Sequence, residues 1–311
     1  MVPGEYVSEY VAVRSSGTLM CLGSGACFGA MAIFGKLAYE EGATVGTLLS
    51  VRFALAAVMF WALVLATGAG RDARAMPRRD LGIGLALGAL GYAAQATCFF
   101  TALERIDASL LSLLLYTFPA MVAAAAVVLG REVMTARRLI ALVLASGGLV
   151  LVLAGAGAGK LDPLGAVLGL GAALVYTTYI LSSQGISGRM RPILLAALVC
   201  TGAAVCLGTG SALLGELHPG DLTAEGWVWM VSIAVVSTVG AVGLFFAGLS
   251  RVGPTAASIL ATVEPLVTVV LAFIVFGETL GPAQLLGGAL VLAAVFVLQL
   301  RPRLVPARAA A

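Results

Sequence analysis

Three charged residues, Lys36, Arg52 and Glu264, lie inside apolar stretches that are long enough to span a lipid bilayer. A charge at the centre of a membrane costs about 2.5–3.5 kcal/mol on insertion scales, so each is a candidate functional residue, and Glu264 and Lys36 are the two that could bind the charges of a zwitterionic solute directly. Lys36 and Arg52 are expected near the outer and inner ends of their stretches, where long side chains also reach the interface or pair with another helix. Glu264 directly precedes Pro265, so we expect it either to face a cavity or to hold the helix that the proline breaks.

Polar and aromatic side chains recur at helical spacing in two of the apolar stretches. Gln95 lies between Tyr92 and Phe99, and Tyr176 and Tyr179 share one face of a later stretch. Buried amide and hydroxyl groups need polar partners or water, which favours a cavity. Aromatic faces with a few polar groups suit a ligand with an apolar body and one polar end, as in aromatic and large aliphatic amino acids.

Further hydroxyl and aromatic residues in neighbouring stretches complete the predicted cavity. The residues that we expect to bind a substrate are Tyr92, Gln95, Phe99, Ser112, Tyr116, Thr117, Tyr176, Tyr179, Ser237, Phe245, Ser258 and Glu264. Thr238, next to Ser237, is a further option. For any single hydroxyl, a bond to the backbone of its own helix is the alternative.

Two prolines stand in the middle of apolar stretches. Pro119 and Pro265 each remove a backbone hydrogen bond, so both helices are predicted to kink. Kinks at matching places in two helices are natural hinges, and a static bend is the alternative.

The sequence lacks the motifs of soluble enzymes and of cofactor sites. Gly159-Lys160-Leu161 is not a phosphate-binding loop, because Ala154 stands where that loop needs glycine and Leu161 where it needs Ser or Thr. A single histidine, His218, excludes the His-Glu-x-x-His zinc motif. The five cysteines lie in apolar stretches without paired spacing. We therefore expect no cofactor, no metal and no catalytic residues.

The composition predicts an all-α integral membrane protein. Of 311 residues, 61% are hydrophobic and 11% are charged, against about 45–50% and about 25% in soluble domains. Backbone groups in lipid must bond within a helix or a closed barrel, and these apolar runs are too continuous for barrel strands. At about 20 residues per span, ten helices use almost the whole chain. The predicted spans are 17–38, 44–67, 81–101, 108–128, 136–155, 163–183, 192–214, 226–247, 254–276 and 281–300.

The distribution of lysine and arginine residues predicts the orientation. Such residues in short loops resist translocation and stay in the cytoplasm. Most of the 18 fall in loops that share a side with both termini, among them Arg14 and Arg301, whereas Lys36, Arg105 and Lys160 fall on the other side. We predict a multi-pass protein of a bacterial inner membrane with both termini cytoplasmic.

The two halves of the sequence match each other at one constant offset. The segment Phe99-Phe100-x-x-Leu103-x-Arg105 recurs as Phe245-Phe246-x-x-Leu249-x-Arg251. The same offset pairs Ser112 with Ser258, Pro119 with Pro265 and Glu132 with Glu278. Each half, 1–155 and 156–311, has five spans, so the second half must be inverted relative to the first. Inverted repeats around a central cavity are the architecture of many secondary transporters, and a duplicated scaffold without transport is the alternative.

Motifs near the C-terminus resemble a known family. Ala261-Thr-Val-Glu264-Pro265-Leu and Phe276-Gly277-Glu278-Thr, followed by Gln284-Leu-Leu-Gly287-Gly288, are similar to the closing helices of the drug/metabolite transporter superfamily, EamA type. The first half has Phe118-Pro119 and Gly130-Arg131-Glu132 at the matching places, with Phe118 where the second half has Glu264. Within the family, the chain looks closest to the YddG-like exporters of aromatic amino acids. The resemblance implies ten helices in an inverted 5 + 5 arrangement, a central cavity and export rather than uptake.

The first hypothesis is a secondary transporter or facilitator that exports small metabolites, chiefly aromatic or large neutral amino acids, by alternating access. A membrane-embedded enzyme acting on lipid or peptide is an alternative from another class, although Glu264 has no evident partner carboxylate or histidine. An exporter of drugs or other metabolites is a further alternative. We expect a small-molecule substrate and the lipid bilayer as partners, no nucleic acid, and a monomer as one option for the assembly.

Overall fold

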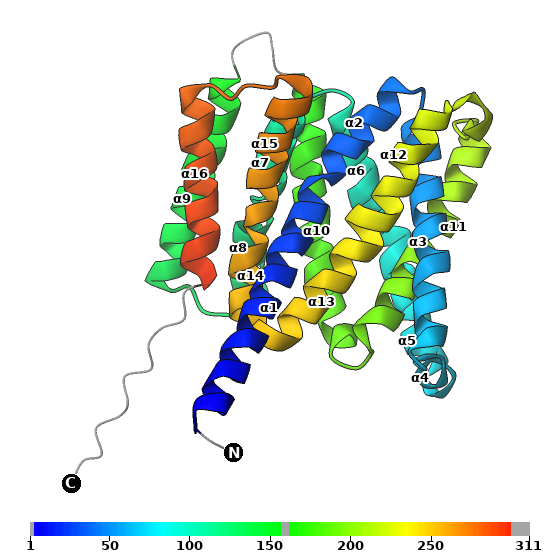
Figure 1. The fold of residues 1–311 in the computed structure, drawn as a ribbon. Helices are drawn as coiled ribbons and strands as arrows, with labels where there is room; N and C mark the ends of the chain where they lie inside the picture. The colour runs from blue at the N-terminus through cyan, green and yellow to red at the C-terminus, as the bar shows by residue number, and fades with distance from the viewer. Residues whose placement is uncertain (1–2, 157–161, 300–311) are drawn as a thin grey trace.

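The computed structural model describes residues 3–156 and 162–299, which form helices joined by short loops (Figure 1). The helices of the first half are α1 (Pro3–Gly29), α2 (Met31–Glu40), α3 (Val45–Ala66), α4 (Gly70–Ala75), α5 (Arg78–Ala86), η1 (Leu87–Tyr92), α6 (Ala93–Leu103), α7 (Ala108–Leu115), α8 (Phe118–Val128) and α9 (Ala136–Gly155). Those of the second half are α10 (Pro163–Ser187), α11 (Pro192–Leu214), η2 (Pro219–Asp221), α12 (Ala224–Ala234), η3 (Val235–Gly240), α13 (Ala241–Val252), α14 (Pro254–Ala261), α15 (Val263–Phe276) and α16 (Pro282–Gln299).

Taken singly or joined with the next segment in the chain, these helices form ten spans that are long and apolar enough to cross a membrane. Their positions confirm the ten predicted spans to within a few residues. The largest difference is in the eighth span, which continues to Val252 instead of ending at residue 247. The predicted all-α fold of two inverted five-helix repeats is confirmed, and the protein is a multi-pass membrane protein.

The first span of each half packs against the third span of the other half, across the middle of the molecule. α1, the first span of one half, packs along α13, which belongs to the third span of the other half. The inverse contact joins α10, the first span of the second half, to α6 in the third span of the first. α3 pairs with α11 at one end of the bundle and α9 pairs with α16 at the other (Figure 1). This reciprocal packing is what two inverted repeats produce, and it leaves the central space between the halves.

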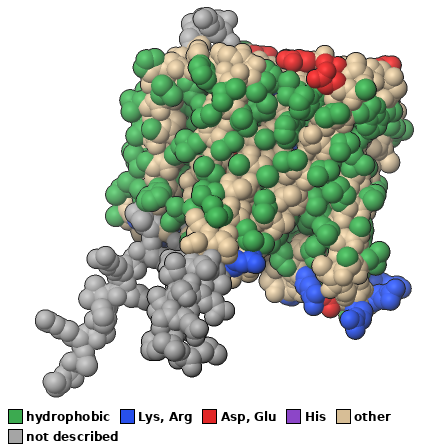
Figure 2. Space-filling view, viewed as in Figure 1, with side chains coloured by type: hydrophobic (Ala, Val, Ile, Leu, Met, Phe, Trp, Pro, Cys, Tyr) green, Lys and Arg blue, Asp and Glu red, His purple; other side chains and the backbone are tan. Residues whose placement is uncertain are grey.

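Charged side chains mark two opposite faces of the bundle. We call the side with loops 41–44, 104–107, 215–223 and 277–281 the acidic face, and the side with loops 67–77, 129–135 and 188–191 the basic face. In Figure 2 acidic side chains lie along the upper edge and Lys and Arg along the lower edge, with an apolar belt between them. α1 begins and α16 ends at the basic face (Figure 1). Lys160 and Arg301, used in the orientation argument, lie outside the described residues.

Both spans with a proline in the middle are interrupted where the sequence predicts a kink. The fourth span breaks between α7 and α8, and Pro119 stands in the first turn of α8. The ninth span breaks at Thr262 between α14 and α15, and Pro265 stands in the first turn of α15. A proline is tolerated in a first turn because the N–H groups there have no partner within the helix.

The third and eighth spans each contain a short π-helical segment. η1 lies between α5 and α6, and η3 lies between α12 and α13, so the wide turns occupy related places in the two repeats. A π-turn inserts one extra residue into a helix and shifts the direction of the side chains beyond it, and such turns are frequent at functional sites. The sequence gives no signal for these segments, and the prediction missed them.

Close backbone contacts hold the third span against α11. A Cβ atom on Gly88 would lie 2.0 Å from the carbonyl oxygen of Val199, and one on Gly202 would lie 2.0 Å from that of Leu85. Only glycine allows helices to approach this closely. These contacts bring the end of η1 next to α11 and α10, at the wall of the central space.

Candidate functional site

A cavity of about 510 Å³ lies between the two halves of the bundle. Its lining reaches Pro192 and Gln299, which are the basic-face ends of α11 and α16. Toward the acidic face the lining ends at Phe100, Ser112 and Thr268. The volume is in the range of small-molecule sites, and the cavity extends from mid-membrane to the basic face.

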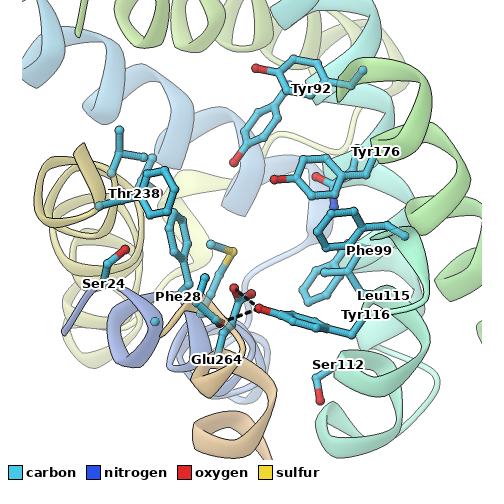
Figure 3. Close-up of a pocket in the computed structure, with 18 of the residues that line it drawn as sticks. Ser24, Phe28, Tyr92, Phe99, Ser112, Leu115, Tyr116, Tyr176, Thr238 and Glu264 are labelled. Atoms are coloured by element: carbon cyan, nitrogen blue, oxygen red, sulfur yellow. Dashed lines mark hydrogen bonds between the residues drawn. The ribbon is translucent and has the colours of Figure 1, made fainter. Parts of the chain in front are cut away.

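A row of aromatic rings lies along one side of the cavity, and every ring in it except that of Phe53 lines the cavity. This aromatic row consists of Phe53, Tyr92, Tyr179, Tyr176, Phe118 and Tyr116, in that spatial order. Successive ring centroids are between 4.7 Å and 6.1 Å apart, within the contact distance of aromatic pairs. Figure 3 shows Tyr176, Phe99 and Tyr116 projecting from this side, while Phe28, Ser24 and Thr238 face them from the other.

One end of the aromatic row meets the acidic side chain of the cavity. The hydroxyl of Tyr116 lies 3.0 Å from Oε2 of Glu264 and 2.8 Å from the carbonyl oxygen of Ala261 (Figure 3). Glu264 is held in the first turn of α15, directly after the break at Thr262. The break therefore places a carboxylate on the cavity wall, close to a helix N-terminus that favours negative charge.

The other end of the row meets the basic side chain of the cavity. Arg52 lines the cavity, yet only 2% of its surface is exposed to solvent. Its guanidinium carbon lies 4.9 Å from the ring centroid of Phe53 and 5.4 Å from that of Phe100. Its Nε donates a hydrogen bond of 3.0 Å to Oγ1 of Thr238, and the Tyr92 side chain also interacts with it.

The position of Arg52 differs from the prediction. The residue was expected near the inner end of its helix, but α3 starts at the acidic face and Arg52 lies in its second turn. Burial leaves no route for the guanidinium to reach an interface. The reading of Arg52 as an anchor at the membrane surface is therefore wrong.

Lys36 lies outside the cavity, in a separate cluster at the acidic face. Its Nζ lies 2.7 Å from Oε1 of Glu278 and 4.0 Å from Oδ1 of Asp107. Glu278 also accepts hydrogen bonds from the backbone N–H groups of Ala108 and Ser109 and from the Ser109 hydroxyl. Burial of Glu278 favours its neutral form, but the bonds from Lys36 and Ser109 outweigh this and lower its pKa. Lys36 therefore forms an ion pair with a carboxylate of the protein, and does not bind a charged group of a ligand in the cavity.

Most of the residues predicted from the sequence lie on the cavity wall. They are Tyr92, Gln95, Phe99, Ser112, Tyr116, Tyr176, Tyr179, Phe245, Ser258 and Glu264, together with the hinge residue Pro119. Thr117 and Ser237 are buried away from the lining, and the Thr117 hydroxyl donates to the carbonyl oxygen of Leu114. The second hinge residue, Pro265, is also outside the lining.

Several wall residues were not among those predicted to bind a substrate. Arg52, Phe28, Phe118 and Phe246 line the cavity, as does Thr238, which was named only as an option. Phe118 had a signal in the sequence, because it occupies the place of Glu264 in the first repeat. The two equivalent positions thus supply an aromatic ring from one half and a carboxylate from the other.

Comparison with known proteins agrees with this architecture. The sequence profile of the EamA-like transporter family matches residues 15–154 and again residues 163–300. An uncharacterized transporter of Archaeoglobus fulgidus is 30% identical over 199 residues, which cover 64% of this chain and 70% of the relative. The uncharacterized transporter YcbK of Bacillus subtilis is 27% identical over 279 residues, covering 88% of this chain and 89% of the relative. A solved crystal structure has a TM-score of 0.64 at 19% identity, covering 92% of this chain and 96% of that chain, which indicates a shared fold. The chain belongs to the EamA-like transporter family, and its function is transport.

Proposed function

We propose that the protein exports aromatic and large neutral amino acids across a bacterial inner membrane, as the YddG-like exporters do. The observation that carries this proposal is the aromatic row, which offers stacking surfaces along one wall, while hydroxyl and charged groups lie at its ends and the amide of Gln95 is also in the lining. A ring or a large aliphatic chain can pack on the row, and the polar groups can orient a head group. A small polar solute would leave these rings in contact with water.

The side on which the cavity reaches the surface supports the proposed direction of transport. Lys and Arg residues gather at the face where α1 begins and α16 ends, which the positive-inside rule assigns to the cytoplasm. The cavity extends to that same face. A solute would enter from the cytoplasm, which is the starting point of export, with both termini cytoplasmic.

Alternating access is supported by the paired breaks. The fourth and ninth spans are interrupted at related positions, and both contribute residues to the cavity wall. Inverted repeats that carry matching breaks can exchange conformations, so that the cavity closes on one face and opens on the other. One chain supplies the whole cavity wall, so a monomer is sufficient for this cycle.

The main alternative, an intramembrane enzyme, has less support. The lining contains Glu264 as its acidic residue and no histidine or aspartate, and the side-chain partner of Glu264 is Tyr116. A hydrolytic mechanism needs a nucleophile with a base within hydrogen-bond reach. In the described lining, the hydroxyl recorded within hydrogen-bond reach of the Glu264 carboxylate belongs to a tyrosine, a less common nucleophile than serine or cysteine.

Counterflow in proteoliposomes tests the proposal. Vesicles loaded with unlabelled phenylalanine, tryptophan, leucine, glutamate, lysine or a sugar are diluted into labelled solute of the same kind. We expect accumulation of the aromatic amino acids and leucine well above protein-free vesicles, and none for lysine or the sugar. If only the sugar or lysine shows counterflow, the protein is a transporter but the proposed substrate class is wrong.

A further inference from the structure

We propose that Arg52 binds the carboxylate of the transported solute and makes the cavity selective for solutes that carry one. This inference rests on the proposed function, because it names the group that the site recognises. Of the two cations inside the membrane spans, Lys36, which was the one expected to bind a charged group of the substrate, is paired with Glu278. Arg52 is the cation that remains on the cavity wall.

The first step is the electrostatic state of Arg52. A guanidinium stays protonated at any physiological pH, so its charge cannot be removed by burial. In the described part of the chain no carboxylate lies within ion-pair distance of Arg52, whereas five of the other basic residues there have such a partner. Its neighbours are the Thr238 hydroxyl, Tyr92 and the rings of Phe53 and Phe100. Neutral partners and rings ease the cost of a buried cation without neutralising it.

The second step concerns how the site is built. Thr238 belongs to η3 and Tyr92 is the last residue of η1, so both π-helical segments supply a neighbour of Arg52. Thr238 also donates to the carbonyl oxygen of Ile233, which orients its hydroxyl oxygen toward Nε of Arg52. The guanidinium is thus held on one edge by a fixed acceptor. Its planar fork is the geometry that binds a carboxylate through two parallel hydrogen bonds.

The third step is the polarity of the cavity. At the constant offset of the repeat, Arg52 corresponds to Leu198 and Glu264 corresponds to Phe118. The first half therefore contributes the positive charge and the second half the negative charge. At each equivalent position, the other half has an apolar residue. The aromatic row begins with Phe53, beside Arg52, and ends with Tyr116, beside Glu264. A solute with a carboxylate at Arg52 can lay its apolar body along the rings of the row that line the cavity, from Tyr92 to Tyr116, with Glu264 beyond them.

The first test uses the protein without substitutions. Uptake of labelled phenylalanine into proteoliposomes is challenged with 3-phenylpropionate, which lacks the amine, and with phenylalaninamide, which lacks the carboxylate. We expect 3-phenylpropionate to compete about tenfold or more better than the amide, since a charge-assisted bond to the guanidinium is lost in the amide. Equal competition by the two compounds would overturn the role of Arg52.

The second test compares Arg52→Gln and Arg52→Lys with Arg74→Gln, a matched control on an exposed residue of α4. The readout is the ratio of the apparent affinities for phenylalanine and phenylalaninamide, which does not depend on how much protein folds. Arg52→Gln should bring this ratio close to one, Arg52→Lys should lower it partly, and the control should leave it unchanged. If Arg52 is only structural, the variants lose both ligands in proportion and the ratio stays at its original value.

A binding assay separates this inference from the proposed function. Purified protein in detergent is heated with a panel of aromatic and aliphatic carboxylates, each paired with its amide, and the shift in Tm is recorded. Stabilisation by carboxylates that Arg52→Gln abolishes supports the site even if vesicles carry no amino acid. If no carboxylate in the panel shifts the Tm of the unsubstituted protein more than its amide does, Arg52 is not a carboxylate site.

Discussion

Lys36 Nζ lies 2.7 Å from Oε1 of Glu278, and this ion pair joins α2 to the loop between α15 and α16 at the acidic face. The same carboxylate accepts bonds from the first residues of α7, Ala108 and Ser109. Its repeat counterpart, Glu132, forms an ion pair with Arg138 at the basic face instead. The acidic face is thus tied together by a contact between distant segments, whereas the cavity extends to the basic face.

Replacing Glu278 with Gln should loosen the acidic face. The variant loses the ion pair with Lys36, and its amide group cannot accept at both former carboxylate oxygens. In a protein whose other cysteines are replaced, Cys200 on the cavity wall should react several-fold faster with an impermeant maleimide added from the outside. Asp107→Asn is the control, because Asp107 is 4.0 Å from Lys36 and largely exposed. Equal labelling in Glu278→Gln and the unsubstituted protein would contradict the role of this ion pair in closing the acidic face.

The same contact should depend on pH in one direction. The pKa of Glu278 is below its ordinary value, so its charged form stabilises the folded protein. This stabilisation is complete at pH values above the ordinary pKa and is lost as the pH falls through the lowered pKa. Maleimide labelling of Cys200 should therefore stay flat between about pH 6 and pH 8 after correction for thiolate reactivity. An increase on raising the pH within this range, beyond that correction, would contradict the sign.

Replacing Pro265 with Ala should slow transport while insertion and abundance stay near normal. Alanine would allow the helix to close across the break at Thr262, and a stiffer ninth span would hinder the change between conformations. Initial rates in vesicles, normalised to inserted protein, provide the measurement. Pro282→Ala, at the exposed start of α16, is the control. Unchanged rates for Pro265→Ala would show that the proline only bends the helix.

Gln95→Ala and Tyr179→Ala should each impair transport of bulky neutral amino acids more than folding. Loss of one neutral hydrogen bond corresponds to about 0.5–1.5 kcal/mol, or about 2–10-fold in apparent affinity. Thr178→Ala is a suitable control, because Thr178 is exposed on the same helix as Tyr179 and its hydroxyl donates to the carbonyl oxygen of Val175 in that helix. Wild-type rates for both variants would mean that other faces line the pathway.

A methyl group at Gly202 should destabilise the bundle. Its Cβ would lie 2.0 Å from the carbonyl oxygen of Leu85, so α11 and α5 must separate, and overpacking of this kind costs about 1–3 kcal/mol. Gly208→Ala on the same helix meets nothing within 4 Å and should be neutral or slightly stabilising. Thermal unfolding of the two variants in one detergent compares them directly, and equal Tm values would contradict the close packing.

Fusion reporters test the orientation. Two reporters are attached in turn at each end of the chain, one active only in the cytoplasm and one active only outside. The cytoplasmic reporter should be active at both ends and the external reporter inactive, because the basic loops resist translocation. The external signal from either end would reverse the proposed direction of transport.

The sequence alone determined the spans, the repeat and the broken helices. In lipid, the backbone groups of a segment bond within that segment, so the length of an apolar run is enough to define a helix. Pro119 and Pro265 interrupt their helices for an equally local reason, the missing N–H group. Tertiary structure decided which side chains share the cavity. Lys36 is drawn to Glu278 from a distant loop, Thr117 and Ser237 turn away from the lining, and η1 and η3 bring Tyr92 and Thr238 to Arg52. The rotation of a helix about its axis and the insertion of a π-turn depend on the packing of other helices, which no local pattern of residues encodes.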